Sequence, residues 1–403
     1  MLPKRNILYC LLAGPLLAGV VPAPLLAQTA ENGLSWEANV RARYEHVDDD
    51  AFADNADATT ARLRLGLRYR FDDHWSVLLE GAGVAAAGDH DDGTNARRDL
   101  PAIIDPEGAG WNQWLVAWKG ERGAATLGRQ RVVFANQRWV GNSGWRQNEQ
   151  TFDAASFEYA PAKDLRMRYA WFDRVHRVNG DDARDPLARE RDLDTHVAEL
   201  AWTRGTVQWA ADALLHEDRD VAIASTATLG LRLSATGVHD GRGPSIEVEA
   251  AHQRDHANNP LQFSHAYWRI EPAYARSGIT YRMGWEHLGG NGTHALQTPL
   301  ATLHAFNGWA DKFAAATPPG GLEDMYAGVA GKTVCEGCEW VLTWHDYRAD
   351  AAIPGDHYGS EWNASFAFPL SKGFKGLVKF ADYNADDYAR DTAKVWLQLE
   401  WQR

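Results

Sequence analysis

The chain has 403 residues, of which 45% are hydrophobic and 11% aromatic, so it can build a large core and is too apolar for a disordered chain. Its formal net charge of -13 disfavours a surface built to bind nucleic acid phosphates. Eighteen Trp and 36 Gly against four Met and three Cys favour β-structure over a helical core.

The first 27 residues predict a cleaved signal peptide. Lys4 and Arg5 precede an apolar stretch, Ile7–Leu26, and the chain turns polar after Ala27. An N-terminal membrane anchor is the alternative, but three prolines interrupt the stretch. We therefore expect residues 28–403 to form the exported domain. No later segment approaches the ~18 to 20 apolar residues of a spanning helix, which leaves a periplasmic protein, a secreted protein or an outer-membrane barrel.

Hydrophobic residues recur with a period of two along the chain. Residues 62–71 alternate Arg or Gly with Leu, Tyr and Phe, which is the pattern of a strand with one polar and one apolar face. Eighteen segments fit this description. The predicted strands are 34–45, 59–71, 75–86, 111–119, 124–130, 152–160, 165–173, 195–203, 206–216, 224–236, 245–253, 264–275, 278–288, 324–331, 338–347, 358–369, 375–383 and 392–402.

The connections between these segments alternate between long and short, except around residues 217–244. Outer-membrane barrels have this arrangement, with long extracellular loops and short periplasmic turns. A sheet in a membrane must close, because open edges would leave unpaired backbone groups in hydrocarbon. The fold expected is therefore all-β, a closed antiparallel transmembrane barrel of about 18 strands around an aqueous lumen. A soluble β-sandwich or carbohydrate-binding β-protein is the alternative.

If the apolar face of each strand meets lipid, the arginines on the other face line the lumen. A charge on the lipid face would cost ~2 to 4 kcal/mol at mid-depth. Guanidinium groups can bind carboxylates of a solute in a bidentate manner, or they can pair with glutamates on neighbouring strands, and both roles stay open. The candidate pore-lining residues are Arg41, Arg43, Arg62, Arg64, Arg68, Arg129, Arg131, Arg138, Arg146, Asp153, Arg166, Arg168, Arg269 and Arg282.

The segment 131–151 combines arginines with Trp139 and Trp145. Porins commonly fold one loop inward, and this composition would suit gripping an acidic sugar by charge and ring stacking. A loop on the outer surface is the alternative.

Three stretches resemble the alginate export family of outer-membrane porins. They are Leu127–Gln130, Val140–Asp153 and His304–Phe313. The resemblance implies an eighteen-stranded barrel with an arginine-lined conduit for a polyuronate. It also implies an electropositive constriction containing Arg129, Arg131 and Arg146, with Asp153 as carboxylate partner, and it places Asn307–Phe313 in the seventh long loop.

Other motifs predict little chemistry. Cys335 and Cys338 are expected to form a disulfide across a periplasmic turn, because one CxxC without a second pair does not make a structural zinc site. The histidines show no metal-ligand spacing, so no metal site or cofactor is predicted. Acidic runs such as Asp48–Asp50 are expected to be solvated loop tips, with divalent cations as the alternative. No serine nucleophile motif is present, so no catalytic residue is predicted.

The sequence thus predicts a passive channel in the bacterial outer membrane and no enzyme. Its expected solute is an acidic oligo- or polysaccharide such as a polyuronate. The alternatives are a diffusion porin for small carboxylates and an outer-membrane barrel hydrolase. The expected partners are outer-membrane lipid and lipopolysaccharide, the anionic carbohydrate or carboxylate, and periplasmic export proteins, with no nucleic acid.

Overall fold

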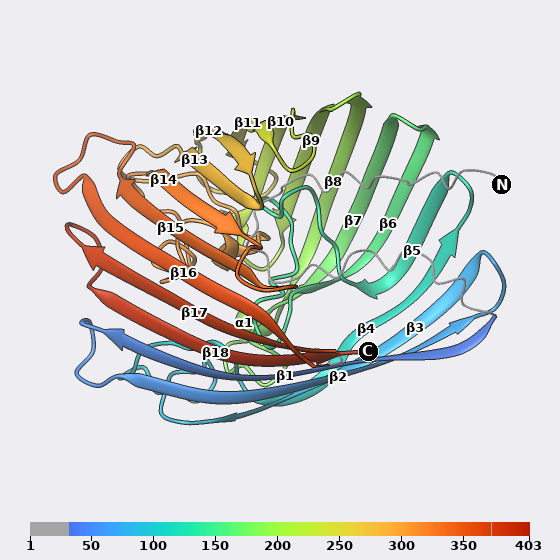
Figure 1. The fold of residues 1–403 in the computed structure, drawn as a ribbon, viewed down its shortest axis with the longest axis horizontal. Helices are drawn as coiled ribbons and strands as arrows, with labels where there is room; N and C mark the ends of the chain where they lie inside the picture. The colour runs from blue at the N-terminus through green and yellow to red at the C-terminus, as the bar shows by residue number, and fades with distance from the viewer. Residues whose placement is uncertain (1–31, 372) are drawn as a thin grey trace.

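A computed structural model describes residues 32–371 and 373–403. The predicted signal peptide, residues 1–27, lies outside the described residues. In the described part, eighteen antiparallel strands form one closed sheet in which each strand pairs with its neighbours in sequence and β1 pairs with β18 (Figure 1). The register at the closure sets Arg41 opposite Glu400 and Arg43 opposite Gln398. The predicted barrel and its strand number are confirmed.

The strands match the predicted segments closely. They are β1 (Gly33–Asp49), β2 (Ala56–Arg70), β3 (Trp75–Ala87), β4 (Gly108–Lys119), β5 (Gly123–Gln130), β6 (Thr151–Ala162), β7 (Leu165–His176), β8 (Glu190–Arg204), β9 (Val207–Asp218), β10 (Thr226–Thr236), β11 (Gly243–Asp255), β12 (Ser264–Arg276), β13 (Ile279–Leu288), β14 (Leu322–Gly331), β15 (Glu339–Arg348), β16 (His357–Ser371), β17 (Phe374–Ala385) and β18 (Thr392–Gln402). One short helix, α1 (Pro186–Arg189), and two 3₁₀ turns, η1 (Ala222–Ala224) and η2 (Leu303–Ala305), interrupt the loops. None of these described helical segments is long and apolar enough to span a membrane.

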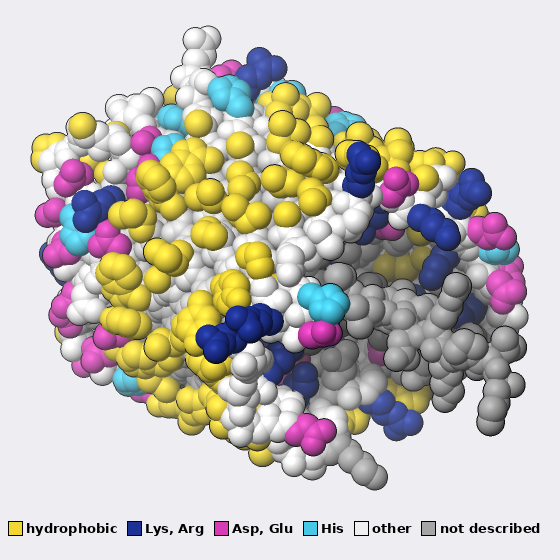
Figure 2. Space-filling model, turned by 45° about the horizontal axis from the view of Figure 1, so that its top comes forward, with side chains coloured by type: hydrophobic (Ala, Val, Ile, Leu, Met, Phe, Trp, Pro, Cys, Tyr) yellow, Lys and Arg dark blue, Asp and Glu magenta, His cyan; other side chains and the backbone are white. Residues whose placement is uncertain are grey.

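The two faces of the sheet differ as the alternation predicts. On β2, Leu63, Leu65 and Leu67 are 44%, 52% and 54% exposed on the outer wall, whereas Arg62 and Arg64 point inward and are 2% and 8% exposed. Hydrophobic side chains cover the outer wall between two rims that carry charged residues (Figure 2). This surface suits hydrocarbon, because burying the leucines in lipid removes apolar area from water while the arginines avoid it.

The ends of the barrel also differ. The short-turn end has connections such as Ser277–Gly278, where both residues have positive φ (53° and 77°), as the tight turn of a two-residue hairpin requires. Cys335 and Cys338 lie at this end, in the turn between β14 and β15, and are joined by a disulfide. The long-loop end carries, among others, the loops L3 (residues 131–150), L7 (residues 289–321) and L8 (residues 349–356).

Candidate functional site

L3 and L7 fold into the lumen and contact each other there. The backbone amide of Gly141 donates to the carbonyl oxygen of Leu300 at 2.9 Å, and the Arg146 guanidinium pairs with Asp311 at 2.9 Å. The inward course of L3 excludes the alternative of a loop on the outer surface. Asn307–Phe313 lies in the seventh long loop, where the resemblance placed it.

A row of arginines on β1 and β2 holds L3 against the barrel wall. Their guanidinium groups donate hydrogen bonds of 2.6 to 3.5 Å to the backbone carbonyl oxygens of residues 144–147. The arginines are Arg41, Arg43, Arg62 and Arg64. Backbone carbonyls in a buried loop lack strand partners, so these side chains supply the donors that the loop needs.

Most of this row also meets carboxylates. Arg43 pairs with the buried Asp105 at 3.0 Å, and both Arg41 and Arg62 reach Glu400, at 3.1 and 3.5 Å. The arginines of β1 and β2 therefore mainly hold L3 in place, and the neighbouring carboxylates partly compensate their positive charges. This is the pairing role that the sequence left open.

Glu149 of L3 forms the centre of a charged network. Arg64 lies 3.2 Å from its carboxylate, Arg131 also pairs with it, and Asn112 donates to it at 2.6 Å. Burial alone would raise the pKa of Glu149, but the two arginines outweigh burial and lower the pKa to about 2. Glu149 is therefore an anion at neutral pH, and its contacts with Arg64 and Asn112 hold L3 to β2 and β4.

A cavity of about 590 Å³, called cavity A here, lies below this network toward the short-turn end. Its described lining includes six arginines and four glutamates. They are Arg41, Arg62, Arg64, Arg68, Arg131, Arg403, Glu37, Glu80, Glu149 and Glu400. Arg68 differs from the others on β1 and β2, because its side chain has no hydrogen bond or ion pair within the described residues. It offers an uncompensated positive charge to anything that enters cavity A.

A second cavity of about 50 Å³, called cavity B here, lies on the long-loop side of Glu149. Glu149 lines both cavities, so it stands at their boundary. Arg129 and Arg177 also line cavity B, and no side-chain partner of Arg177 occurs in the described part of the chain. Burial and the neighbouring Arg191 lower the pKa of Arg177 to about 10, which leaves this guanidinium charged at neutral pH.

The remaining predicted residues are dispersed over the lumen. Arg129 pairs with Asp153 at 2.9 Å, as the resemblance implied, and Arg138 pairs with Glu286 at 2.9 Å. Three further sets bind carboxylates or a hydroxyl. In these, Arg166 and Arg168 approach Glu199, Arg269 pairs with Glu247 and Glu271, and Arg282 donates to the Thr343 hydroxyl. The arginines predicted from the sequence therefore do not gather into one binding site.

The expectation that Trp139 and Trp145 stack on a sugar is wrong. Both are buried, at 5% and 8% exposure. Trp139 donates its indole N–H to Glu249 at 2.8 Å, and Trp145 is packed between Arg43 and His304. Other side chains of the protein occupy these ring faces. A loop that folds into the lumen buries its aromatic rings against the protein and pairs its polar groups there.

Two residues of the candidate site, Glu149 and Arg177, were not predicted from the sequence. Glu149 lies beside Arg146 in a segment where arginine and tryptophan drew attention, and Arg177 lies in a loop taken as external. Glu149 could have been predicted from its position in the same loop as Arg131. Arginines that are buried together in a loop need a carboxylate to compensate their charge.

Comparisons with known proteins show the fold. No family model and no curated protein matches the chain. Among solved structures, OccAB4 of Acinetobacter baumannii is 10% identical, with a TM-score of 0.70 over 94% of this chain and 100% of that chain. OccK9 (OpdG) of Pseudomonas aeruginosa is 13% identical, with a TM-score of 0.72 over 92% and 99%. OccK5 (OpdH) of the same organism is 11% identical, with a TM-score of 0.71 over 92% and 98%.

These similar structures are outer-membrane porins, and this chain has their fold. The closed barrel with an apolar outer wall belongs in the bacterial outer membrane, as predicted. By the usual orientation, the short-turn end is periplasmic and the long-loop end is extracellular. The resemblance to the alginate export family gains no support from these comparisons.

Proposed function

We propose that this protein is a passive diffusion porin for small anionic solutes, and for carboxylates in particular. The observation that carries the proposal is the position of Arg68 and Arg177 on opposite sides of Glu149, since neither guanidinium group has a side-chain partner among the residues that the structure describes. A guanidinium group can bind a carboxylate through two parallel hydrogen bonds. A carboxylate entering from either side therefore meets an available cation before it reaches the network around Glu149.

The sizes of the cavities support a small solute over a polymer. Cavity A, at about 590 Å³, falls in the range of small-molecule sites, whereas cavity B, at about 50 Å³, is far below it. Six arginines against four glutamates around cavity A favour anions over cations there. Charged side chains in a confined passage select by local concentration and need no cofactor or energy source.

A conduit for a polyuronate, the first expectation from the sequence, has weaker support. The tryptophans that would stack on sugar rings are packed within the protein, and cavity B on the long-loop side of Glu149 has a volume of only about 50 Å³. A diffusion porin for small carboxylates, the alternative expected from the sequence, fits these features better.

The proposal is tested by swelling of liposomes that contain the purified protein. Sodium salts of small mono- and dicarboxylates are compared with uncharged sugars of similar size, with a cation ionophore present so that no charge accumulates. We expect carboxylates to enter faster than the sugars, and we expect the double variant Arg68→Gln, Arg177→Gln to lose most of that preference. Arg98→Gln, which removes an exposed loop arginine, is the matched control and should keep it.

Two results would overturn the proposal. One is equal entry of sugars and carboxylates through the unaltered protein. The other is entry of uronate oligomers as fast as that of single carboxylates, which would restore the polyuronate conduit.

A further inference from the structure

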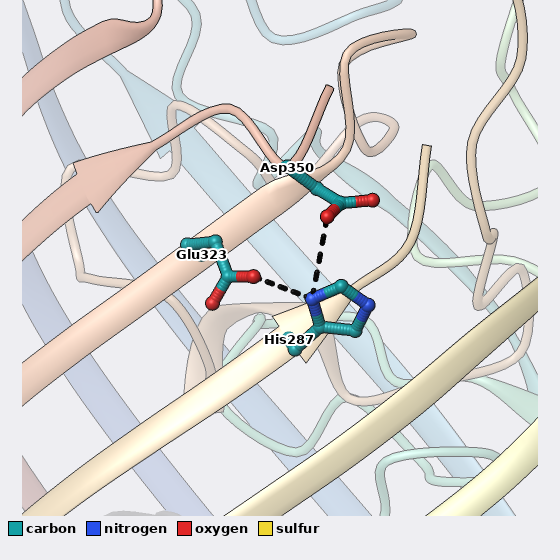
Figure 3. A group of neighbouring side chains, drawn as sticks. All are labelled: His287, Glu323 and Asp350. Carbon is teal, nitrogen blue, oxygen red and sulfur yellow. Dashed lines mark hydrogen bonds and ion pairs between the residues drawn. The ribbon is translucent and has the colours of Figure 1, made fainter. Parts of the chain in front are cut away.

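Three potential metal ligands meet at the extracellular end of the barrel. His287 lies on β13, Glu323 on β14 and Asp350 in L8 (Figure 3). The Nδ1 atom of His287 is 2.5 Å from Glu323 Oε1 and 3.8 Å from Asp350 Oδ1, and one ligand atom from each residue lies within 4.8 Å of the others. The three side chains thus converge on one small volume.

The group sits at the base of L7. His287 and Glu323 are directly opposite each other in the β13–β14 ladder, one pair below the point where the strands separate into L7. They share the outward face of these strands with Trp285 and Met325, which are 43% and 39% exposed. Asp350 adds the neighbouring loop L8. The cluster therefore connects the two ends of L7 with each other and with L8, on the outer face of the barrel rim.

The second carboxylate oxygens of Glu323 and Asp350 have other partners. The indole N–H of Trp285 donates to Glu323 Oε2, and the backbone amide of Gly290 donates to Asp350 Oδ2 at 3.0 Å. The His287 ring is stacked on Trp268, with ring centroids 5.3 Å apart and planes at 7°. Metal ligands are commonly oriented by such outer contacts, which leave one atom of each ligand directed at the ion.

No lysine or arginine of the described chain balances the charge of the cluster. Within the described residues, the only basic side chain paired with Glu323 or Asp350 is His287 itself. With neutral imidazole, the group carries two negative charges in partly buried surroundings. A divalent cation would neutralise both carboxylates, which a single protonated histidine cannot do.

We propose that His287, Glu323 and Asp350 form a site for a divalent transition-metal ion of the Zn²⁺ type. One imidazole nitrogen and two carboxylate oxygens are the ligand set that suits such ions, whereas Ca²⁺ and Mg²⁺ prefer oxygen ligands alone. Water completes the coordination. The ion links both stems of L7 to L8, and so it stabilises the loop that holds L3 in the lumen.

The sequence predicted no metal site because the three ligands lie far apart in the chain. L7 separates His287 from Glu323, and β15 separates Glu323 from Asp350. No short motif joins them, and only the strand register brings them together.

The test uses the purified, folded barrel after treatment with a chelator. Isothermal titration with Zn²⁺ is expected to show one site per chain, and with Ca²⁺ or Mg²⁺ no comparable binding. Asp350→Asn, a loop substitution that leaves the strands intact, should weaken Zn²⁺ binding at least tenfold. Trp285→Phe, which removes the donor to Glu323, should weaken it by about 10- to 100-fold. Co²⁺ in place of Zn²⁺ should give a visible absorption spectrum that Asp350→Asn abolishes.

His239→Ala is the matched control, because His239 lies exposed beside Asp240 in a turn at the other end of the barrel. It should bind Zn²⁺ like the unaltered protein. The proposal is overturned if Zn²⁺ does not bind stoichiometrically to a barrel that is shown to be folded by its heat-dependent gel mobility. It is also overturned if His239→Ala lowers the affinity as much as Asp350→Asn does.

Discussion

The guanidinium carbon of Arg43 lies 4.0 Å from the centre of the Trp145 ring, and the same guanidinium donates a 2.6 Å hydrogen bond to the carbonyl oxygen of Trp145. One side chain on β1 thus holds both the backbone and the ring of a residue in L3. The same ring also stacks on His304 of L7, with ring centroids 4.9 Å apart. Trp145 therefore connects the barrel wall with both lumen loops.

Replacing Arg43 with alanine should loosen L3. The substitution leaves Asp105 buried without its cation, and removing one partner of a buried pair costs about 3 to 5 kcal/mol. We expect trypsin, added to the folded barrel, to cut after Arg146 much faster than in the unaltered protein, as detected by mass spectrometry of the fragments. Arg122→Ala in an exposed short turn is the control. Unchanged protection of Arg146 in the Arg43 variant would contradict this role.

Acid should loosen the contact between L7 and the wall through His304. Its Nδ1 lies 2.7 Å from Asp311 Oδ1, and its Nε2 lies 2.6 Å from Lys379 Nζ. Burial lowers the pKa of His304 from 6.5 to about 3, with Lys379 contributing in the same direction and Asp311 opposing it. The imidazole of His304 therefore binds a proton less tightly when L7 is docked than when L7 is free. The contribution of His304 is therefore complete above about pH 6.5 and is lost as the pH falls toward 3.

Single-channel recordings check this expectation. Conductance fluctuations should increase between pH 7.5 and pH 4.5 in the unaltered protein and should change little in His304→Gln, which keeps a hydrogen-bonding side chain without a proton to gain. An equal increase in both proteins would assign the acid effect to another group.

The alternation of side chains was enough to predict the strands, because lipid outside and polar groups inside impose a period of two on every strand. The ends were less predictable. The segment predicted as 34–45 extends to Asp49, because the alternation reverses there and Val47 is buried on the inward face in a small apolar cluster. The course of L3 and L7 could not be derived, because the partners of Arg146 and Arg43 are Asp311 and Asp105, which are far away in sequence. The positions of the arginines in the sequence therefore indicated which face of each strand points into the lumen. They did not indicate which guanidinium groups are free to bind a solute.

The disulfide between Cys335 and Cys338 should contribute little to the barrel. A bridge that closes so short a loop reduces the entropy of the unfolded chain by the equivalent of only about 2 kcal/mol. The ladders of β14 with β15 and of β15 with β16 hold both sides of the turn independently. We expect the double variant Cys335→Ser, Cys338→Ser to keep the heat-dependent mobility shift of a closed barrel. Loss of the shift under the same conditions would mean that the turn is needed for closure.

The central claim is that Arg68 and Arg177 make the lumen selective for anions, while the arginines that hold L3 are largely compensated. Its most direct test is the reversal potential across a KCl gradient in a planar bilayer. We expect chloride preference in the unaltered protein. Removing one such charge about 5 Å from the ion path in water disfavours chloride by about 0.8 kcal/mol and favours potassium by about the same amount, so Arg68→Gln should lower the chloride-to-potassium permeability ratio about 16-fold. A cation preference in the unaltered protein, or an unchanged ratio in the double variant Arg68→Gln, Arg177→Gln, would contradict the account.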